Sequence, residues 1–382
     1  MDGGNEKDKM KFVVLGGGFG GVSAASELSK LQKRSKNVGI TMIDRKTRLE
    51  YQAAHPEILS GKVTPDEISG DLNKFTAKIG AEFINDTVVN IDFKAKKVKT
   101  GNEGREMPYD FLVIPVGAEQ TFFGIPGAEE WSCSVNTLKG AVETKNALDK
   151  LDFFAKDICI AVIGAGLTGV EVAGELIDYL RGKEASAKIS IVEMMPRVLP
   201  TFPTENVSNY VAKFLSDRGV EILTETAVQE VREHEITFKN GKKRHYDIII
   251  WTAGIKPNSL LEKLDVPKVK GWLKVDPYLR VEGMKDVFAV GDTVSFESEG
   301  VRAGQNAEEA ERQGEVAAVN IIKTIKAEKL KRYIPKNTIQ NPRAFISLGS
   351  NKAVMYFRGM VIKVLAYRLK KFVEWNYMRK FK

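Results

Sequence analysis

A strand, a glycine-rich turn and a helix follow one another at two places in this chain. The first copy reads "KFVVLGGGFGGVSAASEL" over residues 11–28, and the second reads "ICIAVIGAGLTGVEVAGEL" over residues 158–176. Each turn has the spacing Gly-x-Gly-x-x-Gly, which permits a tight bend and lets backbone N–H groups approach a pyrophosphate at the helix N-terminus. Each copy therefore predicts a βαβ unit that binds a dinucleotide.

An acidic residue ends the strand that follows each glycine turn. Asp44 closes "VGITMID" and Glu193 closes "KISIVE", where a carboxylate accepts hydrogen bonds from a ribose. Glu193 favours NADH over NADPH because a carboxylate repels a 2′-phosphate, although Arg197 close by weakens that preference. We call the two turns the first and second cradle; their glycines are Gly16, Gly18 and Gly21, and Gly164, Gly166 and Gly169.

The repeat extends beyond the glycine turns. "YDFLVIPVGA" in the first half is echoed by "YDIIIWTAG" in the second, so two related halves are expected. Apolar strand-like runs alternate with helical patterns through most of the chain, which is typical of α/β architecture. With 382 residues, 43% of them hydrophobic and 28% charged, the chain is expected to fold into two or three domains.

Together these segments resemble the flavoproteins that carry two dinucleotide-binding domains, in which the first cradle holds FAD and the second holds NAD(P)H. "VFAVGD" resembles the group's second FAD motif, and "YDFLVIPVGA" its linker motif, with Pro115-Val116-Gly117 in place of the usual Ala-Thr-Gly. The resemblance implies FAD contacts from Gly16, Gly18, Phe19, Gly20, Gly21, Asp44, Arg45, Val89, Gly117, Ala118, Gly291 and Asp292, and NAD contacts from Gly164, Gly166, Thr168, Gly169, Glu193 and Gly254.

Within this group, three segments and the basic aromatic tail are similar to type II NADH:quinone oxidoreductases; the segments are "GAGLTGVEVAGEL", "VEMMPRVLPTF" and "DIIIWTAGIKPN". The resemblance implies a single-chain enzyme on a membrane surface that passes electrons from NADH through FAD to a quinone without pumping protons. It also implies that Glu171 lies close to the nicotinamide and the flavin, where its carboxylate orients the carboxamide or tunes the local charge. The alternative is a helix carboxylate beside a favourable N-terminal dipole.

The motif for the second substrate departs from the family pattern. The family's quinone motif Ala-Gln-x-Ala-x-Gln-x-Gly reads "AEEAERQG" here, with Glu308 and Arg312 at the two glutamine positions. Quinone reduction consumes protons, so Glu308 in an apolar pocket is a candidate catalytic proton donor with a raised pKa. A solvated helix face is the alternative.

Two other functions stay open. The sulfide:quinone oxidoreductases are the nearest relatives by fold, but they use cysteines beside the flavin, and this chain has only Cys133 and Cys159. A flavoprotein whose NADH-bound state regulates a partner is the second alternative. Because the chain lacks a Cys-x-x-Cys pair and a histidine cluster, neither a metal site nor a thiol-disulfide centre is expected. No nucleic-acid-binding module is visible either.

The net charge of +8 comes mostly from residues 358–382, which hold eight Lys or Arg and one acidic residue. Drawn as one helix, this tail predicts an amphipathic anchor at a membrane surface. Packing on the protein itself or on a second subunit is the alternative, so a homodimer stays open. The apolar arc comprises Val361, Ile362, Leu365, Leu369, Phe372, Val373 and Trp375, and the charged arc Lys363, Lys370, Lys371 and Glu374.

The expected location follows from two further features. No segment approaches the roughly 20 apolar residues that cross a bilayer, and residues 1–11 lack the apolar core of a signal peptide. The chain is therefore expected to be a peripheral membrane protein on the cytoplasmic face of the cell membrane. Its expected fold is α/β, with two Rossmann-like dinucleotide-binding domains and a C-terminal amphipathic membrane-binding segment. The expected parts are residues 1–118 and 275–335 for FAD, 119–274 for NAD and 336–382 for the anchor.

Overall fold

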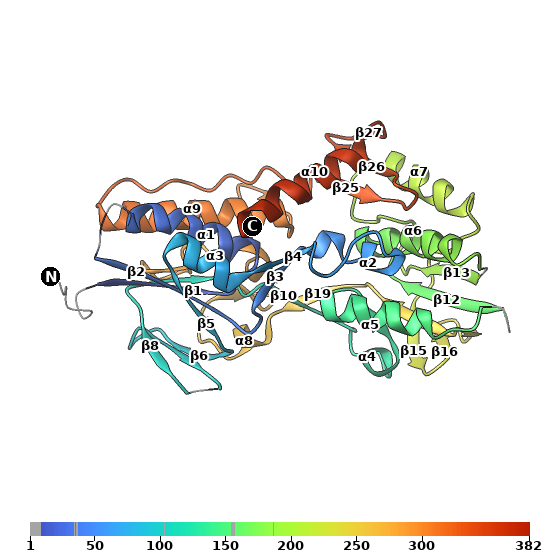
Figure 1. The fold of residues 1–382 in the computed structure, drawn as a ribbon, viewed down its shortest axis with the longest axis horizontal. Coiled ribbons are helices and arrows are strands. Elements are labelled where there is room, and N and C mark those ends of the chain that lie inside the picture. Colours follow the sequence, from blue (N-terminus) through green and yellow to red (C-terminus); the bar gives the residue numbers. More distant parts are fainter. Residues whose placement is uncertain (1–8, 34, 36, 103, 154–156, 186) are drawn as a thin grey trace.

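The computed structural model describes residues 9–33, 35, 37–102, 104–153, 157–185 and 187–382. Figure 1 shows two α/β lobes side by side, with a C-terminal segment that runs over both. Each lobe is built on a five-stranded sheet in which every neighbouring pair of strands is parallel. The predicted α/β class is confirmed.

The sheet of the first lobe has the strand order β22-β9-β1-β2-β5. Helix α1 (Phe19–Gln32) connects β1 to β2 and packs against α9 (Ala307–Ile325). The strands are β1 (Met10–Leu15), β2 (Val38–Asp44), β5 (Glu82–Asn85), β9 (Phe111–Ile114) and β22 (Val287–Ala289). Around them lie β3 (Arg48–Glu50), η2 (Gln52–Ala54), β4 (Ser69–Asp71) and α3 (Leu72–Ile79), and an antiparallel sheet of β6 (Val88–Asp92), β7 (Lys97–Thr100) and β8 (Glu106–Pro108). Between β3 and β4 the chain reaches the second lobe, where α2 (Glu57–Ser60) packs against the helices Leu138–Asp149 and Leu167–Gly182.

The second lobe repeats this plan with the strand order β11-β18-β12-β13-β14. Helix α6 (Leu167–Gly182) connects β12 to β13, so the second βαβ unit forms where the sequence predicts it. The strands are β11 (Cys133–Ser134), β12 (Ile158–Ile163), β13 (Ala187–Val192), β14 (Glu221–Leu223) and β18 (Ile248–Trp251). Around them lie α4 (Ala128–Trp131), α5 (Leu138–Asp149), α7 (Glu205–Ser216), β15 (Val228–Arg232), β16 (Glu235–Phe238) and β17 (Lys243–His245).

The chain enters the second lobe after β10 (Ala118–Gln120) and returns from it through β19 (Ile255–Pro257). Strand β10 pairs antiparallel with β19, and both lie between the lobes in Figure 1. The predicted division of the chain into parts stays a prediction. The smaller elements after β19 are α8 (Ser259–Glu262), β20 (Lys268–Val269), β21 (Trp272–Leu273), η3 (Gly291–Thr293), β23 (Glu297–Ser298) and β24 (Val301–Arg302).

The C-terminal segment differs from the single helix drawn for residues 358–382. It begins with an antiparallel sheet and continues as a helix only from Ala366. The positive φ angles of Arg358 and Gly359 form the hairpin turn between the last two strands, and Leu365 with φ +59° separates the last strand from the helix. The elements are β25 (Arg343–Ser347), β26 (Ala353–Phe357), β27 (Met360–Ile362), α10 (Ala366–Met378) and η4 (Arg379–Phe381).

Helix α10 turns its charged side toward the protein and its apolar side outward. Lys370 and Glu374 are each 6% exposed, whereas Phe372 and Trp375 are 59% and 50% exposed. Lys370 of the charged arc forms an ion pair with Glu57 of α2, whereas Lys363 of that arc precedes the helix and is exposed. Within the described residues, no helix combines the length and the apolar character needed to span a bilayer.

Candidate functional site

A cleft of about 1070 Å³ lies between the two lobes. Its wall includes the turns that follow the first-lobe strands β1, β2, β9 and β22, and the start of helix α6 from the second lobe. Ligands of open α/β sheets bind at the carboxyl ends of the strands, which is where this cleft lies. Of the predicted FAD contacts, those that line it are Gly16, Gly18, Phe19, Gly20, Asp44, Arg45, Val89, Gly117, Ala118, Gly291 and Asp292; Gly21 does not.

The glycines of the first cradle bring two backbone segments into close contact. Gly16 has a φ of +123°, and a Cβ on Gly21 would overlap the carbonyl oxygen of Gly16. A Cβ on Gly18 would meet nothing within 4 Å, so the start of α1 is open. Asp44 accepts a hydrogen bond of 2.6 Å from the N–H of Gly17. An open helix N-terminus beside a carboxylate fits the pyrophosphate and ribose of FAD.

Asp292 faces the same cleft, and its carboxyl has no ion pair among the described residues. Burial raises the pKa of Asp292 to about 6. A carboxyl in this position fits a ligand that brings hydroxyl donors, as the sugar-alcohol chain of FAD does.

Two residues that the sequence analysis missed hold the neighbouring turns of the cleft. The N–H of Gly291 donates to Oε1 of Gln313 at 2.7 Å, and the N–H of Gly117 donates to Oγ1 of Thr293 at 3.0 Å. The first bond spans 22 residues and the second 176 residues, and no spacing in the sequence records either of them.

The second cradle repeats the geometry of the first. Gly164 has a φ of +98°, and a Cβ on Gly169 would overlap the carbonyl oxygen of Gly164. Glu193 accepts hydrogen bonds of 2.8 Å from the N–H groups of Ala165 and Met195. The carboxylate therefore holds the glycine turn against the end of β13, as Asp44 holds the first turn.

The second cradle meets the cleft at one end only. Thr168 and Ile255 line the cleft, whereas Gly164, Gly166, Gly169, Glu193 and Gly254 do not. A dinucleotide lying along this cradle would therefore have one end near Glu193 and the other at the cleft.

Arg197 forms hydrogen bonds within its own loop. Its guanidinium donates to the carbonyl oxygens of Phe202 at 2.6 Å and Thr204 at 3.3 Å. Both terminal nitrogens of the guanidinium are engaged in this way, which does not favour a contact with a 2′-phosphate; the effect of Arg197 on the NADH preference stays a prediction.

Glu171 lies in the wall of the cleft and is 7% exposed. Its Oε1 accepts hydrogen bonds from the N–H of Ser347 at 2.9 Å and from Nζ of Lys370 at 3.1 Å. Lys370 reaches it from helix α10 and also pairs with Glu57 at 3.0 Å. Three parts of the chain that are remote in sequence thus meet at this carboxylate.

The charges in this cluster are unevenly compensated. Burial alone would lower the pKa of Lys370, but the carboxylates of Glu171 and Glu57 outweigh it and raise that pKa. Glu57 has a second cation, Lys371, and its pKa is lowered despite its burial. Glu171 shares one cation, so burial dominates and raises its pKa. Glu171 is therefore the less compensated of the two carboxyls.

Comparison with known proteins agrees with this geometry. The pyridine nucleotide-disulphide oxidoreductase family matches residues 10–314. The chain belongs to this family. Type II NADH:quinone oxidoreductases from Staphylococcus epidermidis and Staphylococcus aureus are 29% and 28% identical to it, each over 96% of this chain and 95% of the relative. The predicted resemblance to that group is confirmed.

Solved structures share the fold over nearly the whole chain. NDH2 of Plasmodium falciparum in complex with NADH superposes with a TM-score of 0.83 at 19% identity, covering 98% of this chain and 96% of that one. The sulfide:quinone oxidoreductase of Aquifex aeolicus also has a TM-score of 0.83, at 21% identity, covering 97% of this chain and 92% of that one. At these identities the likeness establishes the common fold.

Glu308 does not have the apolar surroundings that the sequence analysis expected. Its side chain is 41% exposed, pairs with Arg343 at 3.3 Å and accepts a hydrogen bond from Asn337 at 3.2 Å. It is not among the residues that line the cleft. Arg312, at the other family glutamine position, donates to the carbonyl oxygen of Ile334 at 2.9 Å. Both side chains thus hold the segment that crosses helix α9.

The cysteines and histidines supply no reactive cluster within the described part of the chain. Cys133 lines the cleft, and burial raises the pKa of its thiol, which keeps it protonated. His55 lies in the same wall, where its Nδ1 is 3.0 Å from the carbonyl oxygen of Val135. Burial lowers the pKa of His55 to about 4, so this histidine is neutral at pH 7.

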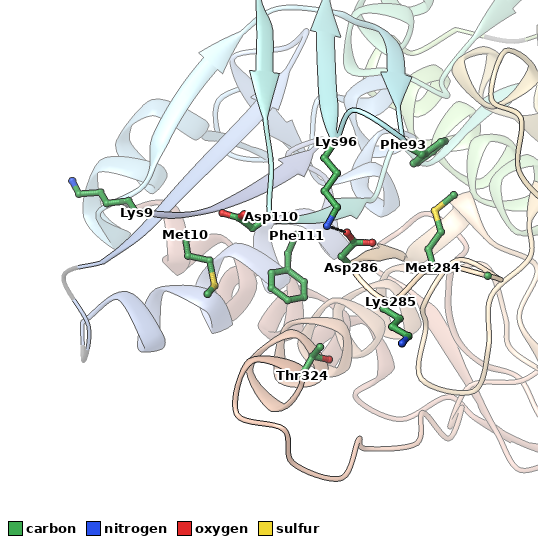
Figure 2. Close-up of a pocket in the computed structure, with 11 residues that line it drawn as sticks. Lys9, Met10, Phe93, Lys96, Asp110, Phe111, Met284, Lys285, Asp286 and Thr324 are labelled. Atoms are coloured by element: carbon green, nitrogen blue, oxygen red, sulfur yellow. Dashed lines mark ion pairs between the residues drawn. The ribbon is translucent and has the colours of Figure 1, made fainter. Parts of the chain in front are cut away.

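A second hollow, of about 960 Å³, lies at the opposite edge of the first sheet (Figure 2). Met10 and Phe111 stand at the first positions of β1 and β9, and Asp286 comes directly before β22. The ion pair between Lys96 and Asp286 crosses it. Because this is the amino edge of the strands, it is the wrong edge for a dinucleotide in this fold.

Proposed function

We propose that this chain is an NADH:quinone oxidoreductase that transfers electrons from NADH through bound FAD to a membrane quinone, without pumping protons. The observation that carries the proposal is the meeting of two dinucleotide cradles at one cleft, where Thr168 and Glu171 of the second lobe face the FAD contacts of the first. The relatives named type II NADH:quinone oxidoreductase, matched over 96% of this chain, support quinone as the acceptor.

Each lobe binds one of the two dinucleotides. Residues of the first cradle, with Asp44 and Asp292, hold FAD; residues of the second cradle, with Glu193 and Gly254, hold NADH. Bound FAD supplies the redox chemistry, since it accepts a hydride and gives up electrons in turn. Glu171 borders the meeting point of the two ligands, where its carboxyl accepts a hydrogen bond from the carboxamide. We assign no proton-donor role to Glu308, because its carboxylate is already paired with Arg343.

The direct test is anaerobic stopped-flow reduction of the purified flavoprotein, followed by mixing with a quinone. NADH should bleach the flavin absorbance much faster than NADPH, and a quinone should restore it. Bleaching by sulfide but not by NADH would instead assign the sulfide:quinone reaction. Reduction by NADH without reoxidation by any quinone would favour a regulatory flavoprotein.

Replacing Glu193 by glutamine should reduce the preference for NADH over NADPH by roughly five- to tenfold, because the repulsion of a 2′-phosphate is removed. The measurement is kcat/KM for both nucleotides. Arg197→Gln is the matched control, since its guanidinium is held by the carbonyl oxygens of its own loop and should leave that ratio unchanged. An unaltered ratio in Glu193→Gln would contradict the role of this carboxylate.

We further propose that helix α10 attaches the protein to the cytoplasmic face of the cell membrane. Its outward side is apolar, and Lys363, Arg368 and Arg379 are exposed around it. Ion pairs satisfy the charges on its inner side, so the apolar side is free to enter the headgroup region. The exposed apolar side chains of the segment, with their exposed fractions, are Met360 53%, Val364 76%, Leu365 57%, Leu369 43%, Phe372 59%, Val373 47% and Trp375 50%.

Replacing Phe372 and Trp375 together by serine should lower the share of protein that floats with anionic liposomes by about tenfold or more, because two exposed apolar side chains are lost from the interface. Trp131→Ser, which removes a 39% exposed tryptophan from the second lobe, is the control and should float like the unchanged protein. Unchanged flotation of the double variant would contradict the anchor. Loss of a dimer without loss of flotation would assign α10 to a subunit contact.

A further inference from the structure

Phe123 is an exposed aromatic residue that the cradles and the cleft do not account for. Its side chain is 62% exposed, and its φ of +54° lies in the left-handed region, which is rare for bulky residues. Its neighbour Phe122 packs against Trp251, with ring centroids 5.6 Å apart. Core packing therefore explains Phe122 but not Phe123.

The ring of Phe123 rests on Gly254. A Cβ on Gly254 would overlap the tip of this ring, and Gly254 itself has a φ of +76°. The adjacent Ala253 lies against the first glycine of the second cradle, where a Cβ on Gly164 would be 3.0 Å from the Cβ of Ala253. Phe123 therefore borders the second cradle through Gly254 and Ala253.

The position of this ring is fixed by the second lobe. Nε1 of Trp251 donates to the carbonyl oxygen of Thr121 at 3.0 Å, and the N–H of Phe123 donates to Oγ1 of Thr121 at 3.0 Å. The segment from Thr121 to Phe123 thus lies beside the end of β18, next to the β10–β19 pair between the lobes (Figure 1). The tip of the ring lies against the backbone of Gly254, and most of the side chain is exposed.

The ring also stands at a definite end of the second cradle. Glu193 lies away from the cleft, whereas Ile255, directly after Gly254, lines it. In the repeated motif Gly254 corresponds to Gly117, which lines the cleft in the first lobe. The half of a dinucleotide that passes Gly254 is consequently the half directed toward the first cradle, which for NADH is the nicotinamide half.

We propose that the exposed ring of Phe123 is the wall against which the nicotinamide half of NADH packs. This inference rests on the proposed role of the second cradle. A flat aromatic face that is exposed before binding and covered afterwards favours a heteroaromatic ring. Glu193 acts on the adenosine half, and Phe123 acts as a positioning residue for the other half.

Fragments of the dinucleotide separate these two roles. NAD⁺ contains both halves, whereas ADP-ribose lacks the nicotinamide ring. Isothermal titration of the FAD-loaded protein should show that Phe123→Ala weakens NAD⁺ about three- to tenfold, the range expected for one lost aromatic contact, and leaves ADP-ribose unchanged. Phe123→Tyr should retain the affinity for NAD⁺, because it keeps the ring.

Two controls keep this test decisive. Ile334→Ala removes a 68% exposed side chain outside both cradles and should change neither affinity. Glu193→Gln should weaken both ligands. Equal weakening of NAD⁺ and ADP-ribose by Phe123→Ala, or no change in either, would overturn the inference. Failure of NADH to reduce the unchanged protein would instead remove the proposed function.

Discussion

Replacing Lys370 by methionine is expected to destabilise the protein by about 3–5 kcal/mol, because Glu57 and Glu171 then stay buried without their shared cation. Lys370 is 6% exposed, and its Nζ lies 3.0 Å from Glu57 and 3.1 Å from Glu171. Methionine keeps most of the aliphatic chain, so the lost charge rather than a cavity dominates. Denaturant unfolding of the FAD-loaded protein measures the change. Arg368→Met, on the exposed side of the same helix, should change stability by less than about 0.5 kcal/mol.

The loss caused by Lys370→Met should also depend on pH with a definite sign. Without the cation, burial raises the folded-state pKa of Glu171 still further above the unfolded value of about 4.3, whereas Glu57 keeps Lys371. Protonation of Glu171 at low pH therefore relieves part of the cost. The difference from the unchanged protein should therefore be smaller near pH 5 than near pH 8. In the unchanged protein the pKa of Lys370 is raised. Its contribution to the free energy of unfolding is therefore complete below about pH 10 and is lost as the pH rises through the folded-state pKa of Lys370.

A second pair of substitutions separates charge from packing in this cluster. Adding Glu57→Gln and Glu171→Gln to Lys370→Met removes both carboxylates that Lys370 paired with and should restore much of the lost stability. A loss that is the same at both pH values and is not relieved by these changes would show that Lys370 acts through packing alone.

The cradles were predictable from sequence because their requirements are local. A glycine whose Cβ would overlap a carbonyl oxygen five residues earlier, as at Gly21 and Gly169, leaves a fixed spacing in the sequence. The acid at the end of the next strand is equally local, since Asp44 and Glu193 each bond the turn directly. Because these requirements are local, the sequence alone predicts two dinucleotide-binding units.

The cluster at Glu171 was not predictable in the same way. The contact between Glu171 and Lys370 joins residues 199 positions apart, and no spacing records it. Within α10 the helical pattern separates exposed Leu369, Phe372, Val373 and Trp375 from buried Lys370 and Glu374, although the other members of the two arcs at positions 361–365 precede the helix. It could not show that the charged side is the inner one, because this depends on Glu57 of α2, a residue remote in sequence. The strand at Met360–Ile362 was missed because its pairing with β26 is set by a turn at Arg358 and Gly359.

Glu308 illustrates a different limit of sequence reasoning. Its place in the family motif suggested a proton donor, yet its carboxylate is bound by Arg343 and Asn337. Arg343 is the first residue of β25, and Asn337 lies in the irregular segment before that strand. Such partners follow from the path of the chain across α9. A motif position therefore predicted where this residue lies on its helix, but not the charge it faces.

Gly21→Ala and Gly169→Ala are expected to fail in different ways, although the two glycines have the same geometry. A Cβ at either position overlaps the carbonyl oxygen of the first glycine in its cradle, and overpacking of this kind costs about 1–3 kcal/mol or more. Gly21→Ala should therefore lose most of its FAD, which the ratio of flavin to protein absorbance measures. Gly169→Ala should keep its FAD and lose its fast reduction by NADH.

The separation of the two effects is what distinguishes two working cradles from one working cradle and one structural copy. In Gly169→Ala, dithionite should still reduce the flavin and a quinone should still reoxidise it, because only the NADH side is altered. Gly39→Ala and Gly182→Ala are the matched controls, since a Cβ at either glycine meets nothing within 4 Å. Both should retain FAD and NADH reduction. If Gly169→Ala were reduced by NADH at the unchanged rate, the second cradle would be a packing element, and the reductant would have to reach the flavin without it.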